Sequence, residues 1–378
     1  MNISFDALPL ISGNMTGIGW CEVGQTTAMA RLHPEDNFYY SFFSRKDDHI
    51  KTERLAPFSE HINPKIAHAS GYLYRAASTY LPIPYKHFFG RDADVTHFFN
   101  YIAPPGVHGK TVITVHDMVY KAFPETVRGR TKWMLISGLK PSMNRADIIV
   151  TDSEFSKSEI LKYFPKYEKK IRVVPCGVDL EKFKPCDTPE RIPEVKRSLG
   201  INGEYFLYLG TIEPRKNLER LISAYHILTQ RIQDAPKLVL AGGKGWLYDS
   251  IFQRVSDLKL ADKVLFTKYI PSEDMNPLMC GALAFVFPSI YEGFGMPPLE
   301  AMACGVPVLA SNAASLPEVT GDCGVICDAY SEESIADGLY TLYNDTALRA
   351  ELSIRGRKRA EGFSWERSAE ILYKAYKE

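Results

Sequence analysis

Two carboxylates, Glu292 and Glu300, frame the start of a predicted helix. The residues between them are rich in glycine, which lets a backbone approach a ligand closely, and in proline, which suits a first helical turn. Exposed amides in that turn can donate hydrogen bonds to hydroxyls or phosphate oxygens, while the two carboxylates contact different parts of one extended ligand. The alternative is a plain turn in which Glu300 only complements the helix dipole.

Two adjacent cations, Arg215 and Lys216, follow the apolar run Tyr205–Leu209 and precede another predicted helix. At the end of a strand, two cations can neutralise a diphosphate without a metal ion. A solvated basic pair is the alternative. Because cations oppose the positive end of a helix dipole, however, their position favours an anionic ligand.

His116 and Asp117 directly follow the apolar run Thr111–Val115. A histidine at the end of a buried strand can bond a ligand hydroxyl or help to position reacting groups. A structural hydrogen bond within the protein explains this histidine equally well.

Gly17 and Gly19 match a dinucleotide-binding fingerprint only in part, since the third glycine of that pattern is replaced by Glu22 and Gly24 is out of step. The pattern therefore speaks against an NAD-dependent oxidoreductase. It predicts instead a flexible loop that closes over a ligand.

Apolar runs alternate with helical stretches along the chain, which favours parallel sheets covered by helices. The predicted strands of the first half are Asn2–Asp6, Asn37–Phe43, Val95–Phe99, Thr111–Val115, Asp147–Thr151 and Ile171–Val174. Those of the second half are Tyr205–Leu209, Lys237–Ala241, Val264–Thr267, Ala284–Pro288 and Pro307–Ala310. Predicted helices include Asn217–Gln230, Pro298–Cys304 and Ser364–Tyr376, and Lys184–Pro193 is predicted as a linker. The fold class is therefore α/β with two doubly wound domains, whose ligands bind in a cleft at the carboxyl ends of the strands.

The 378 residues exceed what one hydrophobic core usually organises, and the formal charge of zero argues against a nucleic-acid partner. The chain up to Cys176 carries a net charge of +5, and the remainder carries −5. Ordinary scatter explains this asymmetry as well as a basic face turned toward anionic lipid or a phosphorylated acceptor.

The seven cysteines are scattered without a Cys-x-x-Cys pair, which predicts neither disulfides nor a zinc site. No run of about 20 apolar residues is present, and the first residues lack the basic region of a signal peptide. A cytoplasmic location is therefore expected.

In combination and in this order, the segments resemble the GT-B glycosyltransferases of the glycosyltransferase 4 family, over essentially the whole chain. The segments that carry the resemblance are Thr16–Gly19, His116–Asp117, Ser153–Lys157, Val174–Asp179, Gly210–Leu218 and Glu292–Glu300. The resemblance implies two Rossmann-like domains that face a central cleft: an acceptor-binding domain over residues 1–180 and a nucleotide-sugar domain over residues 181–362. It also implies that a final helix, residues 363–378, packs back onto the first domain.

The resemblance implies transfer with retention of anomeric configuration, by front-side displacement, without a metal ion or other cofactor. It gives catalytic roles to His116 and to Glu292, which contacts the donor sugar. Arg215 and Lys216 match the diphosphate-binding pair, and Glu300 matches the residue that holds the ribose. Further donor contacts are implied for Gly293, Phe294, Gly295, Met296 and Leu299, with Gly17 and Gly19 in the glycine-rich loop. Cys176 departs from the family pattern, which commonly has asparagine there.

Residues 116–125 and 210–218 look most like bacterial mannosyl- or rhamnosyltransferases of surface polysaccharide synthesis, so GDP-mannose is the expected donor and a saccharide or lipid-linked saccharide the expected acceptor. A UDP-sugar-dependent transferase is the alternative within the class. A sugar-nucleotide epimerase and a non-catalytic sugar-nucleotide-binding protein are the alternatives outside it. The aromatic, basic stretch Tyr72–Tyr101, which includes Arg75, either packs ordinarily or forms an acceptor or membrane-facing surface. In the second case the protein associates peripherally with the cytoplasmic face of the membrane.

Overall fold

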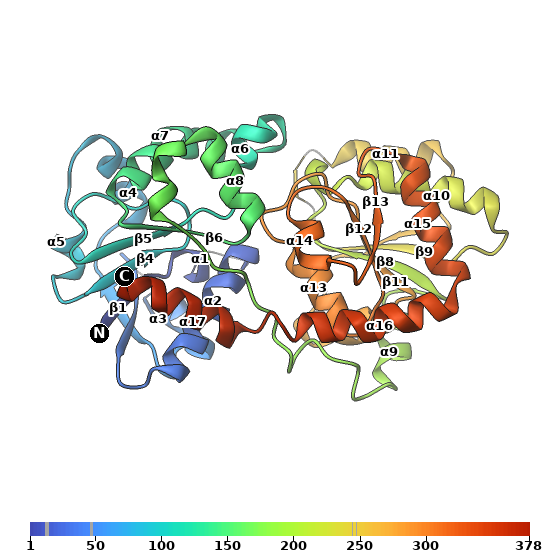
Figure 1. Ribbon diagram of the computed structural model, residues 1–378, viewed down its shortest axis with the longest axis horizontal. Helices are drawn as coiled ribbons and strands as arrows, with labels where there is room; N and C mark the ends of the chain where they lie inside the picture. Colours follow the sequence, from blue (N-terminus) through green and yellow to red (C-terminus); the bar gives the residue numbers. More distant parts are fainter. Residues whose placement is uncertain (12–14, 46–47, 244, 247) are drawn as a thin grey trace. The chain divides into compact units, whose positions relative to one another are not determined.

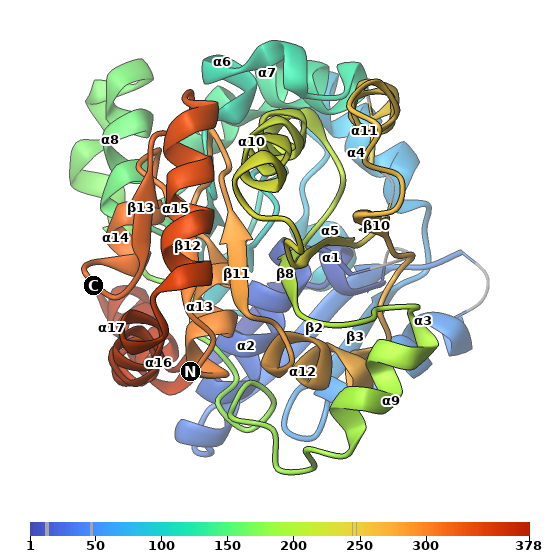
Figure 2. The same ribbon diagram turned by 90° about the vertical axis from the view of Figure 1, so that its right-hand side faces the viewer.

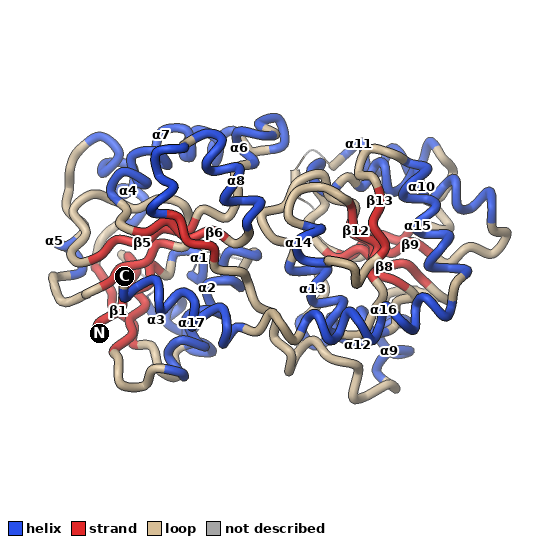
Figure 3. Tube along the Cα trace, viewed as in Figure 1, coloured by secondary structure: helices blue, strands red, loops and turns tan. Residues whose placement is uncertain are grey.

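The computed structural model describes residues 1–11, 15–45, 48–243, 245–246 and 248–378. The chain divides into two compact units (Figure 1). Unit 1 consists of two segments, Met1–Gly177 and Trp365–Glu378, whereas unit 2 is the continuous segment Val178–Ser364. In each unit the strands lie inside and the helices cover them (Figure 3).

Unit 1 contains a parallel sheet in the strand order β3-β2-β1-β4-β5-β6-β7. Its strands are β1 (Asn2–Asp6), β2 (Asn37–Phe43), β3 (Asn63–Ala67), β4 (Val95–Phe98), β5 (Lys110–Thr114), β6 (Ile148–Thr151) and β7 (Ile171–Val173). Successive residues of these strands enter different cores, because side chains of a strand alternate between its two faces. Val112 and Val150 belong to one core, and Ile113 and Ile149 to the other.

The helices of unit 1 cover both faces of this sheet. They are α1 (Leu8–Ile11), α2 (Gly17–Leu32), α3 (Asp48–Leu55), α4 (Gly71–Tyr80), α5 (Lys86–Phe89), α6 (Val119–Ala122), α7 (Gly129–Arg145), α8 (Glu154–Tyr163) and α17 (Trp365–Lys377), with 3-10 turns at Ala56–Phe58, Pro124–Thr126 and Pro165–Lys170.

Helix α17 packs against α2, from the far end of the chain. A Cβ added at Gly24 would lie 2.2 Å from the ring of Trp365, so only glycine fits under that ring. The Gln25 side-chain amide donates to Ser368 Oγ at 3.0 Å, and the Tyr376 hydroxyl lies 2.6 Å from His97 Nδ1. The last helix is therefore part of the core of unit 1.

Unit 2 contains a parallel sheet in the order β10-β9-β8-β11-β12-β13. Its strands are β8 (Tyr205–Leu209), β9 (Lys237–Ala241), β10 (Val264–Phe266), β11 (Ala284–Phe287), β12 (Val308–Ser311) and β13 (Val325–Cys327). Its helices are α9 (Arg191–Ser198), α10 (Leu218–Arg231), α11 (Asp249–Asp257), α12 (Ser272–Cys280), α13 (Met296–Ala303), α14 (Leu316–Thr320), α15 (Glu332–Asn344) and α16 (Thr346–Ala360), with a 3-10 turn at Pro214–Lys216. Helices α10 and α15 pack together, while α13 packs against β11, β12 and α16 (Figure 2).

The predicted α/β class with two Rossmann-like units is confirmed. Every strand expected from the sequence is present, and its ends differ by at most one residue from the prediction. Strands β3 and β13 were not predicted. The predicted linker is wrong in part, because Arg191–Pro193 already belongs to α9. Within the described ranges, no helix is both long and apolar enough to span a bilayer.

Candidate active site

Two loops of unit 2 meet at the carboxyl ends of adjacent strands. Strands β8 and β11 pair in parallel, so the loops after them leave the sheet at the same edge. The backbone amide of Ile290 donates to the carbonyl oxygen of Arg215 at 3.0 Å. The side-chain amide of Asn217 donates to the carbonyl oxygen of Pro288 at 2.9 Å. The sheet order thus joins the two motifs that the sequence presents separately.

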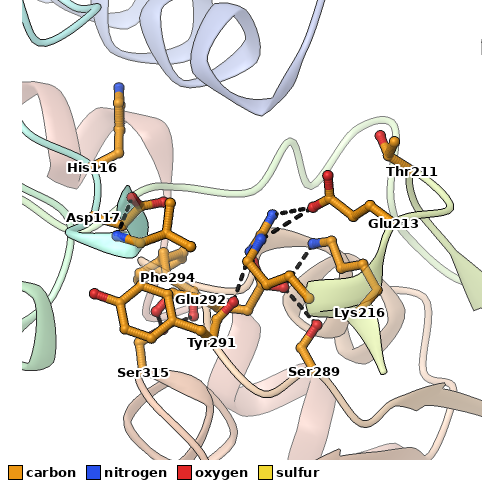
Figure 4. A network of polar contacts seen from close by, with 12 residues as sticks. His116, Asp117, Thr211, Glu213, Lys216, Ser289, Tyr291, Glu292, Phe294 and Ser315 are labelled. Atoms are coloured by element: carbon orange, nitrogen blue, oxygen red, sulfur yellow. Dashed lines mark hydrogen bonds and ion pairs between the residues drawn. The ribbon is translucent and has the colours of Figure 1, made fainter. Parts of the chain in front are cut away.

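The side chains of these loops form one ion network (Figure 4). Arg215 Nη1 donates to Glu292 Oε2 at 2.7 Å, and Lys216 Nζ donates to Glu292 Oε1 at 2.7 Å. Arg215 Nη2 also donates to Glu213 Oε1 at 2.7 Å. Ser289 Oγ donates to Glu292 Oε1 at 2.6 Å. The anion that the two cations contact is therefore the protein's own Glu292.

Apart from the half-buried Arg215, the residues of this network are buried, and its charges are balanced. Burial raises the pKa of Glu292, but Arg215, Lys216 and the hydrogen bond from Ser289 outweigh burial and lower this pKa to about 2. Burial and the charge of Arg215 lower the pKa of Lys216, against the opposing effect of Glu292 and Glu213. Two cations face two carboxylates, so a diphosphate can bind here only if it shares or replaces a carboxylate contact.

The turn before α13 presents backbone amides at a helix start. Gly295 has φ 120°, and a Cβ there would lie 2.8 Å from Leu316 Cδ2, so this position requires glycine. Ser315 Oγ lies 3.0 Å from the carbonyl oxygen of Glu292 and 2.6 Å from that of Phe294, which holds the turn in place. Leu299 is fully buried, so its side chain serves the core of unit 2.

Glu300 lies in the second turn of α13 and is half-buried. Burial raises the pKa of its carboxyl to about 7; Lys182 lowers this pKa and Asp179 raises it. Near neutral pH, Glu300 is therefore close to the point where it changes from a hydrogen-bond donor to an acceptor.

His116 lies two residues after the end of β5 and is buried in unit 1. Its Nδ1 lies 2.7 Å from Asp152 Oδ2, and its Nε2 lies 2.8 Å from the carbonyl oxygen of Phe99. Burial lowers the pKa of His116, but the charge and hydrogen bond of Asp152 outweigh burial and raise it to about 9. Both ring nitrogens thus have protein partners, as the structural interpretation of this histidine expects.

Gly17 and Gly19 lie in the first turn of α2, which corrects the predicted loop. Thr16 precedes the helix with extended backbone. A Cβ at Gly17 would meet no atom of the described residues within 4 Å. Gly13 and Asn14, which the sequence places in the same loop, lie outside the described residues.

Comparison with known proteins gives this arrangement a family. The profile described as Glycosyltransferase Family 4 matches residues 27–182, and that described as Glycosyl transferases group 1 matches residues 192–359. O-antigen chain mannosyltransferase B of Escherichia coli is 37% identical over 272 residues, which cover 71% of this chain and 70% of that protein. This chain is a family 4 glycosyltransferase. Serotype-specific mannosyltransferase WbdA of Escherichia coli is 31% identical to it over 73% of the chain, but only over 34% of WbdA.

Solved structures support the fold of this glycosyltransferase. Anabaena HepE, in complex with UDP-glucose, matches with a TM-score of 0.76 and 18% identity over 99% of each chain. Sucrose-phosphate synthase from Thermosynechococcus elongatus matches with a TM-score of 0.75 and 20% identity, over 100% of this chain and 98% of that one. The predicted GT-B fold is confirmed.

Two residues that contact the predicted site residues, one in each unit, were missed by sequence reasoning. Glu213 stands inside the Arg215 and Lys216 segment and holds Arg215. Asp152 follows β6, which pairs with the strand before His116. The sequence does show that Asp152 follows a predicted strand. It could have been placed beside His116 only if the pairing of β5 with β6 had been known.

Proposed function

We propose that this glycosyltransferase transfers mannose from GDP-mannose, with retention of configuration, to a saccharide or lipid-linked saccharide acceptor. The observation that carries the proposal is the contact of Arg215 and Lys216 with Glu292, beside the amides at the start of α13. The mannosyltransferase names of two relatives favour mannose as the sugar.

In this proposal the donor diphosphate and Glu292 exchange partners. Phosphate oxygens take the positions on Arg215 and Lys216 that the Glu292 carboxylate occupies at 2.7 Å. Glu292 then accepts hydrogen bonds from hydroxyls of the donor sugar. In the free protein the pKa of Glu292 is about 2, so Glu292 enters this exchange as a carboxylate, which accepts hydrogen bonds.

The reaction breaks the bond between the anomeric carbon and the phosphate oxygen, and the acceptor oxygen bonds to the same face of that carbon. The acceptor proton passes to an oxygen of the leaving diphosphate. Arg215 and Lys216 stabilise the negative charge that develops on the leaving group, in a buried site where such contacts are strong. Glu300 is assigned to the ribose hydroxyls and His116 to the reaction centre, as the family resemblance implies.

The test combines nucleotide binding with product analysis. Purified protein without metal ions is titrated calorimetrically with GDP, UDP, ADP and TDP. Selective binding of GDP supports the proposal, selective binding of UDP replaces the donor, and binding of none contradicts a nucleotide-sugar transferase.

Transfer from GDP-mannose to a mannosylated acceptor is then followed by proton NMR. An α-linked product formed from the α-linked donor supports retention, and a β-linked product contradicts it. Free mannose without acceptor would indicate a hydrolase, and isotope exchange at a sugar carbon would indicate an epimerase.

We further propose that α4 and α7 present a surface to anionic lipid. Tyr72 on α4 and Trp133 on α7 are 68% and 57% exposed, and the Arg130 guanidinium lies 5.4 Å from the centre of the Tyr72 ring. Arg75 takes no direct part, because its Nη2 bonds both Asp6 carboxylate oxygens, at 2.9 and 2.8 Å.

Sedimentation with phosphatidylglycerol vesicles tests this surface. The Tyr72→Ala/Trp133→Ala variant is expected to bind these vesicles more weakly than the wild type does. Tyr269→Ala, an equally exposed tyrosine of unit 2, is the control. Equal vesicle binding by the wild type and the double variant would contradict the lipid contact.

A further inference from the structure

Side chains from separate segments of unit 1 meet near the end of β5. Cys21 belongs to α2, while His116, Asp152 and Cys176 follow β5, β6 and β7. One ligand atom from each of Cys21, His116 and Asp152 lies within 4.8 Å of the other two. Cys176 Sγ lies 3.5 Å from Cys21 Sγ. All these side chains are buried, so the fold assembles two thiols, an imidazole and a carboxylate away from solvent.

These donor atoms match a thiophilic divalent cation. Thiolate sulfur, imidazole nitrogen and carboxylate oxygen are the ligands of zinc in proteins. A ligating histidine usually donates from its second ring nitrogen to a carbonyl or carboxylate oxygen, which fixes the tautomer. His116 has this contact, between Nε2 and the carbonyl oxygen of Phe99. The other ring nitrogen, Nδ1, faces Asp152 and is the ligand atom.

Two further features of the cluster favour a bound cation. Asp152 Oδ1 is buried and has no hydrogen-bond partner in the part of the chain that the structure describes. A buried carboxylate oxygen in this state is costly unless a cation or another donor meets it. The Cys176 thiol donates to Cys21 Sγ, as a group that supports a thiolate ligand would.

We propose that Cys21, His116 and Asp152 bind a zinc-like divalent cation, with Cys176 supporting the sulfur of Cys21. On binding, His116 releases its Nδ1 proton and Cys21 its thiol proton, both to solvent. Before binding, the imidazolium balances the Asp152 carboxylate. Afterwards, the two charges of the cation balance one thiolate and one carboxylate. The formal charge of the buried cluster is zero in both states, so loading leaves no buried charge uncompensated.

This site goes beyond the proposed transfer reaction. The cation occupies Nδ1 of His116, the residue that the family resemblance places at the reaction centre. The loaded protein is therefore expected to transfer sugar more slowly, and the cation acts as an inhibitor rather than as a cofactor. The expectation that transfer itself needs no metal ion is unchanged.

Cadmium is a suitable probe, because a cadmium–thiolate bond has a charge-transfer absorption in the ultraviolet. The reduced full-length chain, treated with EDTA and desalted, is titrated with cadmium chloride, and bound metal is counted by native mass spectrometry. We expect one bound cadmium ion per chain with this absorption. Cys21→Ser should remove the absorption, and Asp152→Asn and Cys176→Ser should each weaken binding by roughly 10-fold or more.

Cys280→Ser is the matched control, because Cys280 Sγ lies near Cys304 in unit 2 and offers a competing thiol group. Its cadmium binding should equal that of the wild type. Absorption that survives Cys21→Ser, disappears in Cys280→Ser, or never forms in the wild type would overturn the proposal. The fold of unit 1 in each variant is checked by circular dichroism and by tryptophan fluorescence, which reports mostly on that unit. Should Cys21→Ser or Asp152→Asn fail to fold, the cadmium affinity of Cys176→Ser still decides the question.

Discussion

The polar clusters of the two units follow neighbouring strands of parallel sheets, yet they differ in how readily they can exchange partners. In unit 2, Arg215 and Lys216 hold carboxylates that a phosphate group can imitate. In unit 1, Asp152 and the carbonyl oxygen of Phe99 engage both ring nitrogens of His116. We interpret unit 2 as the part that exchanges an internal anion for a substrate anion, and the His116 pair as one whose carboxylate no substrate anion replaces.

Removing both cations from unit 2 should have the largest effect. Arg215→Ala/Lys216→Ala is expected to weaken GDP binding by about 3–6 kcal/mol, or roughly 10²- to 10⁴-fold, since each charge-assisted hydrogen bond contributes about 1.5–3 kcal/mol. Isothermal titration calorimetry measures this loss. Arg357→Ala/Lys358→Ala removes an exposed pair of the same residue types from α16 and should bind GDP normally.

That double variant leaves Glu213 and Glu292 buried without their cations, so its fold is checked by circular dichroism. A second variant that also carries Glu213→Gln and Glu292→Gln removes the unpaired charges. GDP binding at wild-type strength in both variants would rule out this network as the diphosphate site.

Breaking the His116–Asp152 pair of unit 1 should mainly reduce stability. Asp152→Asn leaves a buried histidine without its carboxylate and is expected to cost about 3–5 kcal/mol. The pKa of His116 is raised from 6.5 to about 9, so its stabilisation is fully present below pH 6.5 and is lost as the pH rises through 9. The full span is about 3 kcal/mol, from a shift of roughly two to three pKa units.

Denaturant unfolding at several pH values measures this dependence. Tryptophan fluorescence reports mostly on unit 1, which contains Trp20, Trp133 and Trp365. The loss of stability between pH 6.5 and 9 should be present in the wild type and absent in Asp152→Asn. Identical pH profiles would show that this pair does not titrate as described.

Changing the exchangeable carboxylate should separate catalysis from nucleotide binding. Glu292→Gln is expected to reduce transfer by roughly 10- to 100-fold, because one charged hydrogen bond to the donor sugar is lost. GDP binding should be unchanged or tighter, since the Glu292 carboxylate then no longer competes with the diphosphate for Arg215 and Lys216. Equal losses of transfer and GDP binding would move Glu292 away from the sugar.

Glu300 gives a smaller effect that depends on pH. A ribose hydroxyl donates to the ionised carboxylate, so GDP affinity should rise as the pH increases through about 7, by roughly tenfold in all, because one charge-assisted hydrogen bond contributes about 1.5–3 kcal/mol. The free energy of unfolding changes in the opposite direction. Because the folded state raises the pKa of Glu300, stability is lost as the pH rises from 4.5 through about 7. Calorimetry in matched buffers measures the affinity, and Glu300→Gln should abolish its pH dependence. A flat wild-type profile would contradict the ribose assignment.

The smallest expected effect is that of EDTA. Since Arg215 and Lys216 do the work of a metal ion in the proposed reaction, transfer should continue unchanged in excess EDTA. Loss of activity that magnesium restores would show that Arg215 and Lys216 are insufficient to stabilise the leaving diphosphate.

The cation site of unit 1 predicts a further effect on transfer. Added zinc should slow transfer by the wild type more than it slows transfer by Cys176→Ser.

The sequence identified the residues of the ion network of unit 2 more readily than those of the cluster of unit 1, for a physical reason. Arg215 and Lys216 are consecutive, and Glu292 and Glu300 belong to one short motif, so local spacing identifies them. Knowing that Glu292 bridges both cations required the pairing of β8 with β11.

The partners of His116 come from distant segments, and only the sheet order places Asp152 beside it. The short edge strands β3 and β13 were not predicted either. Strand β3 contains Pro64, which an edge strand tolerates but which weakens a strand pattern. Gly17 and Gly19 indicated a loop because glycine disfavours helices, but the first turn of α2 contains both.

The return of α17 to unit 1 has a consequence for how the chain is made. Domains usually fold in the order in which they leave the ribosome. Here the segment Trp365–Glu378, which completes the core of unit 1, is synthesised after the whole of unit 2. The half of the protein that begins first is therefore finished last, and the ring of Trp365 covers Gly24 only when translation has passed the second unit.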